Sequence, residues 1–124
     1  MSEHQEQAKF VKWVRVNHPD LLIHSIPNGA NLAGTQTQRV KQWNKLRAEG
    51  ALAGVPDLFI PELRLYIEMK YGSNKLSDKQ KRVIPRLQQA GYQVAVCYSG
   101  DEAIHLVSKL LQNNGSMNVG QNLT

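Results

Sequence analysis

A glutamate inside an apolar segment is the feature that most constrains the fold of this chain. Residues 63–69 have the composition of a β-strand, and Glu68 interrupts their apolar side chains. Residues 57–60 form a second short apolar run, and only Pro61 and Glu62 separate the two runs. Two such strands joined by a tight link predict an antiparallel hairpin.

Charged side chains are expected to meet at one end of this hairpin. Side chains alternate along a strand, so Glu68 and Lys70 share a face and Met69 points to the other. The start of one hairpin strand lies beside the end of the other, which brings Asp57 next to Glu68 and Lys70. A charge within an apolar strand needs a specific reason, because burying an unpaired charge is unfavourable.

This arrangement suggests metal-assisted chemistry. Two carboxylates can hold a hard divalent cation such as Mg²⁺, and the backbone carbonyl of Met69 can supply a further oxygen. Lys70 can orient or deprotonate a water, or hold a phosphate oxygen. Together these groups are suited to phosphodiester hydrolysis. The alternative is that Asp57, Glu68 and Lys70 are solvated, or paired with one another, at the strand ends.

The remaining patterns predict one mixed α/β domain over residues 1–111. Predicted helices cover residues 2–18, 36–49, 77–89 and 99–111, and predicted strands cover 21–26, 57–60, 63–69 and 92–98. The order α-β-α-β-β-α-β-α indicates a small mixed sheet with helices on its faces. Pro85 should bend or weaken the third helix. Residues 112–124 are polar and aperiodic, and are predicted to be a flexible tail.

Length and cysteine content limit the class of protein. With 124 residues the chain can build one hydrophobic core. The single cysteine, Cys97, excludes a disulfide framework and a cysteine-based zinc site within one chain. No apolar run approaches the roughly 20 residues that span a bilayer, and the first residues lack a signal-peptide pattern. We therefore expect a cytosolic or nucleoid-associated protein without membrane contact.

The charge of the chain favours a polyanionic partner. Fifteen Lys and Arg residues against ten Asp and Glu residues give a net charge of +5. The positive charges are concentrated in residues 39–47 and 75–86. This distribution favours nucleic acid as the partner, although many basic proteins bind none.

Three motifs in this order resemble a nuclease family. Gly-Val-Pro-Asp at residues 54–57, Glu-Met-Lys at 68–70 and Ser-Asp-Lys-Gln at 77–80 are similar to the VRR-NUC branch of the PD-(D/E)XK nuclease superfamily. Glu6 matches the glutamate of an early helix in that branch. The resemblance spans about residues 3–110 and is to stand-alone phage and bacterial members. It implies a restriction-endonuclease-like core and a Mg²⁺- or Mn²⁺-dependent DNA endonuclease of the bacterial cytoplasm, encoded by a bacterium or a phage.

The resemblance also implies a site. The catalytic residues would be Glu6, Asp57, Glu68, Lys70 and Gln80, with Glu6, Asp57, Glu68 and the Met69 carbonyl as metal ligands. Branched or Holliday-junction DNA is the implied substrate class, and a homodimer is the implied assembly. The alternatives are an exposed helix carboxylate for Glu6 and a surface glutamine for Gln80. For the whole chain, the alternative is a non-catalytic nucleic-acid-binding module that keeps the nuclease fold.

DNA contacts are predicted from the polar loop at residues 27–38 and the basic segments. Trp43, on the helix at 36–49, would be either a core residue or a platform on which bases stack. Candidate dimer faces are the last helix, the strand at 21–26 and the helix of Trp43. The predicted DNA-binding residues are Asn28, Arg39, Lys41, Lys45, Arg47, Lys75 and Lys79.

Overall fold

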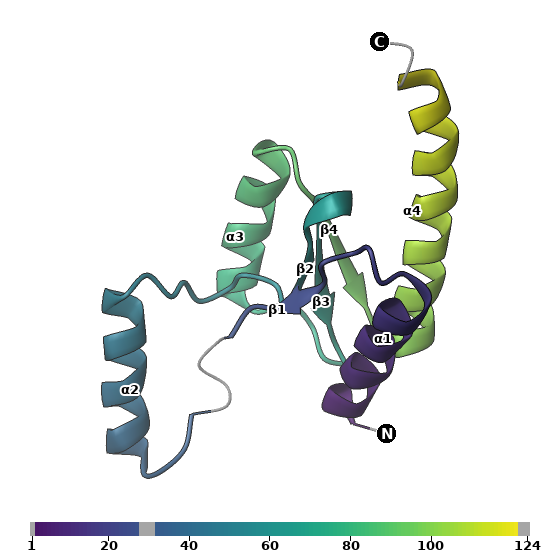
Figure 1. Ribbon diagram of the computed structural model, residues 1–124. Coiled ribbons are helices and arrows are strands. Elements are labelled where there is room, and N and C mark those ends of the chain that lie inside the picture. The colour runs from purple at the N-terminus through teal and green to yellow at the C-terminus, as the bar shows by residue number, and fades with distance from the viewer. Residues whose placement is uncertain (1, 28–31, 122–124) are drawn as a thin grey trace.

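A four-stranded mixed sheet with helices on both faces forms the centre of the protein (Figure 1). The computed structural model describes the backbone of residues 2–27 and 32–121, and the surroundings of their side chains as far as residue 113. The elements are α1 (Glu3–Asn17), β1 (His24–Ser25), α2 (Gln36–Ala48), β2 (Leu58–Ile60), the short 3₁₀ helix η2 (Pro61–Leu63), β3 (Leu65–Met69), α3 (Asp78–Gln89), β4 (Gln93–Cys97) and α4 (Gly100–Gln121). The α/β class and the element order predicted from the sequence are confirmed.

The sheet has the strand order β1-β2-β3-β4. Strand β2 pairs antiparallel with β1 and with β3, whereas β3 pairs parallel with β4. The predicted hairpin is confirmed, with Leu58 opposite Ile67 and Ile60 opposite Leu65. Helix α3 makes the crossover that a parallel pair requires.

Helices α1 and α4 cover one face of the sheet, and α3 covers the other (Figure 1). Alternation along β3 directs Leu65, Ile67 and Met69 into the core with α1 and α4, and leaves Tyr66 and Glu68 on the face of α3. The core facing α1 and α4 includes the buried residues Phe10, Val14, Leu58, Ile60, Leu65, Ile67, Met69, Cys97, Ala103 and Val107.

Three helices begin with the same local device. Ser2, Thr35 and Ser77 each accept a hydrogen bond from the backbone of the residue three positions later, and the glutamine there bonds back to the cap. Such capping boxes satisfy backbone donors that the first helical turn leaves unpaired. They explain why α1, α2 and α3 begin where the sequence predicted.

All four strands are shorter in the structure than predicted, and two of them lose more than one residue at an end. The strand predicted at residues 21–26 is reduced to His24–Ser25, which pair with Phe59 and Leu58 of β2. The strand predicted at 63–69 begins at Leu65, because Pro61–Leu63 form a 3₁₀ turn that ends in Arg64 with φ 49°.

The last helix is longer than predicted. The prediction that it ends at about Leu111 is wrong, since α4 continues to Gln121. The flexibility expected of residues 112–124 stays a prediction. Its first part is anchored by the buried Ala103 and Val107, and extending an existing helix adds one backbone hydrogen bond per residue. Residues 122–124 lie outside the described residues. Helix α3 is unbroken at Pro85.

Helix α2 stands away from the rest of the protein (Figure 1). It contributes no residue to the buried core among the described residues, and Val40 is half exposed. Trp43 is partly exposed as well, so the alternative that placed it in the core is wrong. Among the described residues, no helix is long and apolar enough to cross a membrane.

Candidate active site

The hairpin brings Asp57 beside the end of β3. Leu58 pairs with Ile67 in the antiparallel hairpin, so the preceding residue, Asp57, lies opposite Glu68. The Oδ2 atom of Asp57 accepts a hydrogen bond of 3.0 Å from the backbone N–H of Met69. This bond fixes the Asp57 carboxylate at the sheet end, as the strand pattern predicted.

Glu68 is the centre of the cluster. Its side chain is 4% exposed, and its Oε2 atom lies 3.3 Å from Nζ of Lys70. The same oxygen accepts a 2.6 Å hydrogen bond from Nε2 of Gln80. Four of the predicted site residues, Asp57, Glu68, Lys70 and Gln80, are thus brought together by β3, the segment before β2, and α3.

The other oxygen of Glu68 lacks a partner. Among the described residues, Oε1 is a buried side-chain atom without a hydrogen bond. Burial raises the pKa of Glu68 to about 7, and the charge of Asp57 adds to this effect, against the opposing Lys70 and Gln80. Burial also raises the pKa of Asp57. The site therefore has an excess of desolvated negative charge, which a cation or a proton would relieve.

Gln80 is held by two contacts at once. Its Oε1 atom accepts a 2.8 Å hydrogen bond from the backbone N–H of Ser77. Its Nε2 atom is thereby turned towards Glu68. The alternative of a surface glutamine is wrong, because the capping box of α3 positions this amide against the carboxylate.

Glu6 has a different place in the structure. It lies on α1, and its Oε1 atom accepts a 2.7 Å hydrogen bond from the backbone N–H of Gly100, the first residue of α4. A carboxylate is favourable there, because the first amides of a helix are unpaired donors. No three His, Cys, Asp or Glu side chains within the described ranges gather to hold a metal. The structure therefore does not group Glu6 with Asp57 and Glu68, and its metal role stays a prediction.

A family model described as the VRR-NUC domain matches residues 1–101. The chain belongs to the VRR-NUC family. A solved structure titled "VRR_NUC domain protein" is similar over 90% of this chain and 89% of its own, with a TM-score of 0.68 and 23% identity. At that identity the similarity supports the shared fold. No curated protein matches the chain at a significant level. The resemblance inferred from the three motifs is confirmed, and the family implies nuclease activity.

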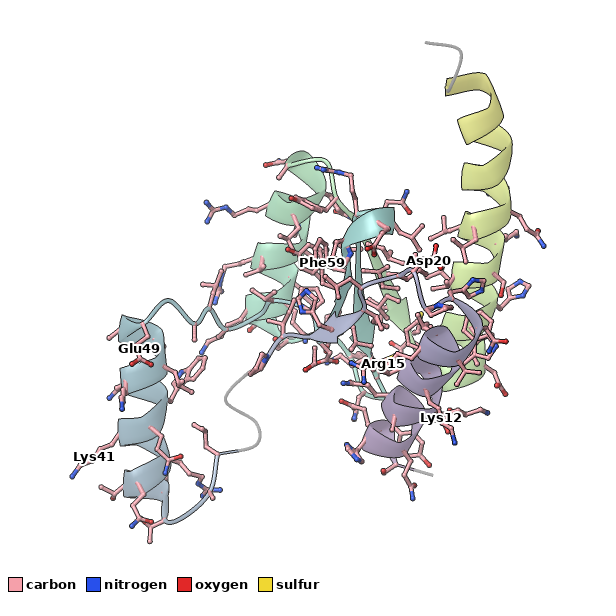
Figure 2. All side chains as sticks on the ribbon, viewed as in Figure 1. Lys12, Arg15, Asp20, Lys41, Glu49 and Phe59 are labelled. Carbon is pink, nitrogen blue, oxygen red and sulfur yellow. The ribbon has the colours of Figure 1, made fainter. Side chains whose placement is uncertain are left out.

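Three of the predicted DNA-binding residues of this VRR-NUC domain line two hollows beside α2 and α3. Arg39 and Lys79 line one of them, and Lys79 with Arg47 also lines the other. Lys41 projects from the outer side of α2, away from the core (Figure 2). Lys45 and Lys75 are exposed, and Asn28 lies outside the described residues.

Arg82 and Arg86 lie within the predicted basic segment 75–86 but are not among the individual residues predicted to bind DNA. They line the second hollow together with Arg47 and Lys79. Lys79, Arg82 and Arg86 follow one another at intervals of three and four residues, which places them on one face of α3. That spacing was a usable signal in the sequence.

Gly54 of the VRR-NUC motif is required by a close contact. Its φ is +99°, and a Cβ atom there would lie 2.6 Å from the backbone oxygen of Lys79. The loop before Asp57 thus packs directly on the first turn of α3, which carries Gln80. This contact couples the positions of the two halves of the site.

Gly54→Ala is therefore expected to destabilise the protein by about 2–4 kcal/mol, combining left-handed strain with overpacking. Urea unfolding measures this loss. The matched control is Gly50→Ala, where φ is +111° and, chain neighbours aside, no atom of the described residues lies within 4 Å of the new Cβ. The control should lose only about 1 kcal/mol. Equal losses in both variants would show that the contact with Lys79 is unimportant.

Proposed function

We propose that this VRR-NUC protein is a metal-dependent endodeoxyribonuclease whose active site is formed by Asp57, Glu68 and Lys70. The observation that carries the proposal is the buried Oε1 atom of Glu68, which has no hydrogen-bond partner among the described residues and lies beside a second desolvated carboxylate. An acidic pair of this kind is unfavourable in the apo protein, which is typical of a site arranged for a ligand rather than for stability.

The donor set fits Mg²⁺ or Mn²⁺. Magnesium is usually bound through one or two carboxylates, with waters and substrate phosphates as its other ligands. Asp57, Glu68 and the Met69 carbonyl would hold it, and a further role for Glu6 stays a prediction. A bound ion would make a water more acidic and stabilise the charge that develops on the phosphate.

Lys70 and Gln80 prepare the substrate side of the site. The Lys70 side chain is 13% exposed, so its ammonium can reach a phosphate oxygen or an attacking water while it stays close to Glu68. Gln80 binds Oε2 of Glu68, and Oε1, which has no hydrogen bond among the described residues, would be the oxygen that takes a metal. The basic side chains along α2 and α3 would bind phosphates without reading sequence.

The proposal includes branched or Holliday-junction DNA as substrate and a homodimer as the active assembly. Resolution of a four-way junction needs two symmetric cuts, and a twofold dimer supplies two identical sites. Val107 is fully buried, so the last helix cannot offer it to a partner. Leu22 and Trp43 are accessible on the other candidate faces.

The decisive assay incubates the purified protein with a labelled four-way junction and with a duplex of matched sequence. We expect cutting in Mg²⁺ or Mn²⁺, no cutting in EDTA, and recovery when metal is restored. Paired cuts within one encounter are expected of a dimer. Junction binding without cutting in any divalent metal would contradict the proposal and favour a non-catalytic binding module.

A further inference from the structure

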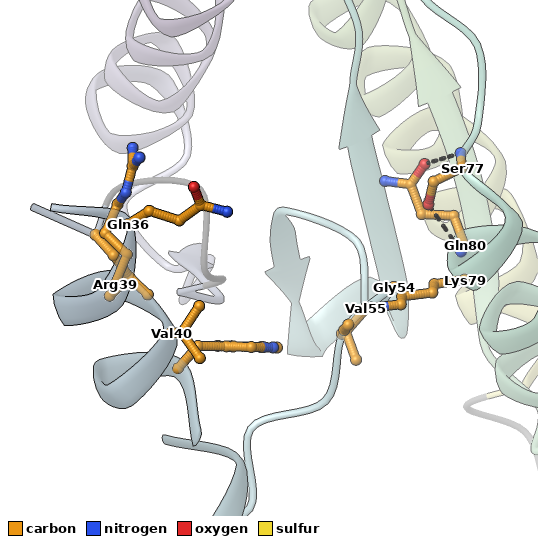
Figure 3. A pocket seen from close by; sticks show the side chains of 11 residues that line it. Gln36, Arg39, Val40, Gly54, Val55, Ser77, Lys79 and Gln80 are labelled. Carbon is orange, nitrogen blue, oxygen red and sulfur yellow. Dashed lines mark hydrogen bonds between the residues drawn. The ribbon is translucent and has the colours of Figure 1, made fainter. Parts of the chain in front are cut away.

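A hollow of about 500 Å³ separates α2 from the body of the protein (Figure 3). Ligand sites are commonly about 300–1,000 Å³, so the hollow could accept a ligand of nucleotide size. Gln36, Arg39 and Val40 face it from α2, and Val55 and Gln80 face it from the opposite side (Figure 3). Trp43 is a further lining residue.

The chemistry of the lining combines flat apolar surface with positive charge. Trp43 supplies an aromatic ring, and Val40 and Val55 supply aliphatic contacts. Arg39 and Lys79 supply cations, and the described residues that line the hollow include no carboxylate. An aromatic ring with neighbouring cations suits a ligand that has a flat base and an anionic phosphate.

One residue, Gln80, belongs both to the lining of the hollow and to the proposed active site. Its side chain donates the 2.6 Å hydrogen bond to Glu68. On the other side of the hollow, Lys79 connects it to the basic hollow of about 330 Å³ lined by Arg47, Arg82 and Arg86. A strand whose phosphates follow these cations would pass the aromatic hollow next to the catalytic carboxylates.

We propose that the hollow between α2 and α3 binds one unstacked nucleotide of a DNA strand, with its base against Trp43 and its phosphate near Arg39 and Lys79. The inference rests on the proposed nuclease function and adds the feature of the DNA that the protein would recognise, an unstacked nucleotide. Bases inside a continuous duplex are stacked on each other and cannot occupy such a site without being extruded. We therefore expect the protein to prefer DNA that has unpaired nucleotides near the cut.

The test follows Trp43 fluorescence in EDTA. The chain has two tryptophans, and Trp13 packs partly buried against the core, so Trp13→Phe leaves Trp43 as the single reporter. We expect a single-stranded oligothymidine to quench this emission strongly. A blunt duplex of the same length should quench it much less.

Variants at position 43 then measure the stacking contribution. Trp43→Ala should weaken single-strand affinity about tenfold, which is within the usual effect of removing one stacking aromatic. Trp43→Phe should restore most of the affinity, and duplex affinity should change little in both. Leu22→Ala, which removes another exposed apolar side chain, is the matched control and should bind as the wild type. Helix α2 has no buried residue, and circular dichroism verifies that each variant is folded.

Three results would overturn the inference. The first is equal quenching by duplex and single strand. The second is unchanged single-strand affinity in Trp43→Ala. The third is an emission change that follows protein concentration without DNA, which would mean that a second copy fills the hollow. Binding is measured in EDTA, so this test does not depend on cutting. If the protein never cut DNA, the nuclease proposal would be refuted, and the binding test could still be carried out.

Discussion

Replacing Lys70 by alanine is expected to abolish cutting and leave DNA binding nearly intact. Lys70 is one of fifteen Lys and Arg residues, so its loss should change the general attraction for phosphates only slightly. Its ammonium lies 3.3 Å from Oε2 of Glu68, where the proposed chemistry takes place. Loss of a group that acts in the transition state typically lowers the rate by about 100-fold or more. Single-turnover cutting of a junction, with binding measured separately in EDTA, checks this.

Lys75→Ala is the matched control for Lys70→Ala. Lys75 is an exposed lysine in the loop between β3 and α3, and its replacement removes the same charge. Both variants should bind DNA similarly, but only Lys70→Ala should fail to cut. A Lys70→Ala protein that cuts at nearly the wild-type rate would show that the site is assigned wrongly.

The hairpin and its charged cluster could be predicted because they depend on local sequence. Strand alternation and the short link between the strands set Asp57, Glu68 and Lys70 beside one another. The position of Gln80 could be predicted as well, because the Ser77 cap defines where α3 begins. These features need no information about distant parts of the chain.

The features that escaped prediction depend on tertiary contacts. Glu6 bonds to Gly100, which is 94 residues away, and nothing in the α1 sequence distinguishes this contact from a metal ligand. The apolar residues Val40 and Trp43 resemble a buried helix face, yet α2 lies away from the core. Helix propensity and spacing describe a helix, but they do not say against what it packs.

Glu68→Gln is expected to abolish cutting and, at the same time, to stabilise the metal-free protein. The carboxylate is buried, and one of its oxygens has no hydrogen-bond partner in the described structure. A neutral amide of the same size removes the desolvated charge and can still accept the hydrogen bond from Gln80. It would, however, be a poorer ligand for a hard cation.

The stabilisation should depend on pH in a defined direction. The pKa of Glu68 rises from an ordinary value of 4.5 to about 7, so the folded protein binds this proton more tightly than the unfolded chain. The free energy of unfolding of the wild type therefore falls as the pH rises from the ordinary pKa to the raised pKa of Glu68. Above the raised pKa the whole of this loss is present. One pKa unit corresponds to about 1.4 kcal/mol, which gives an expected advantage for the variant of about 1–3 kcal/mol at pH ~8. The advantage should shrink towards pH ~5.

Urea unfolding in EDTA at both pH values measures this difference, and Glu49→Gln is the control because that carboxylate is exposed at the end of α2. Adding Mg²⁺ should reverse the ranking, since an ion that binds only the folded wild type stabilises it by an amount that grows with the logarithm of the ion concentration. A variant that is less stable than the wild type at every pH would mean that the contacts of Glu68 with Lys70 and Gln80 outweigh its desolvation. A variant that is stabilised and inactive would instead show that this carboxylate is kept for function at the expense of stability, as expected for a ligand site.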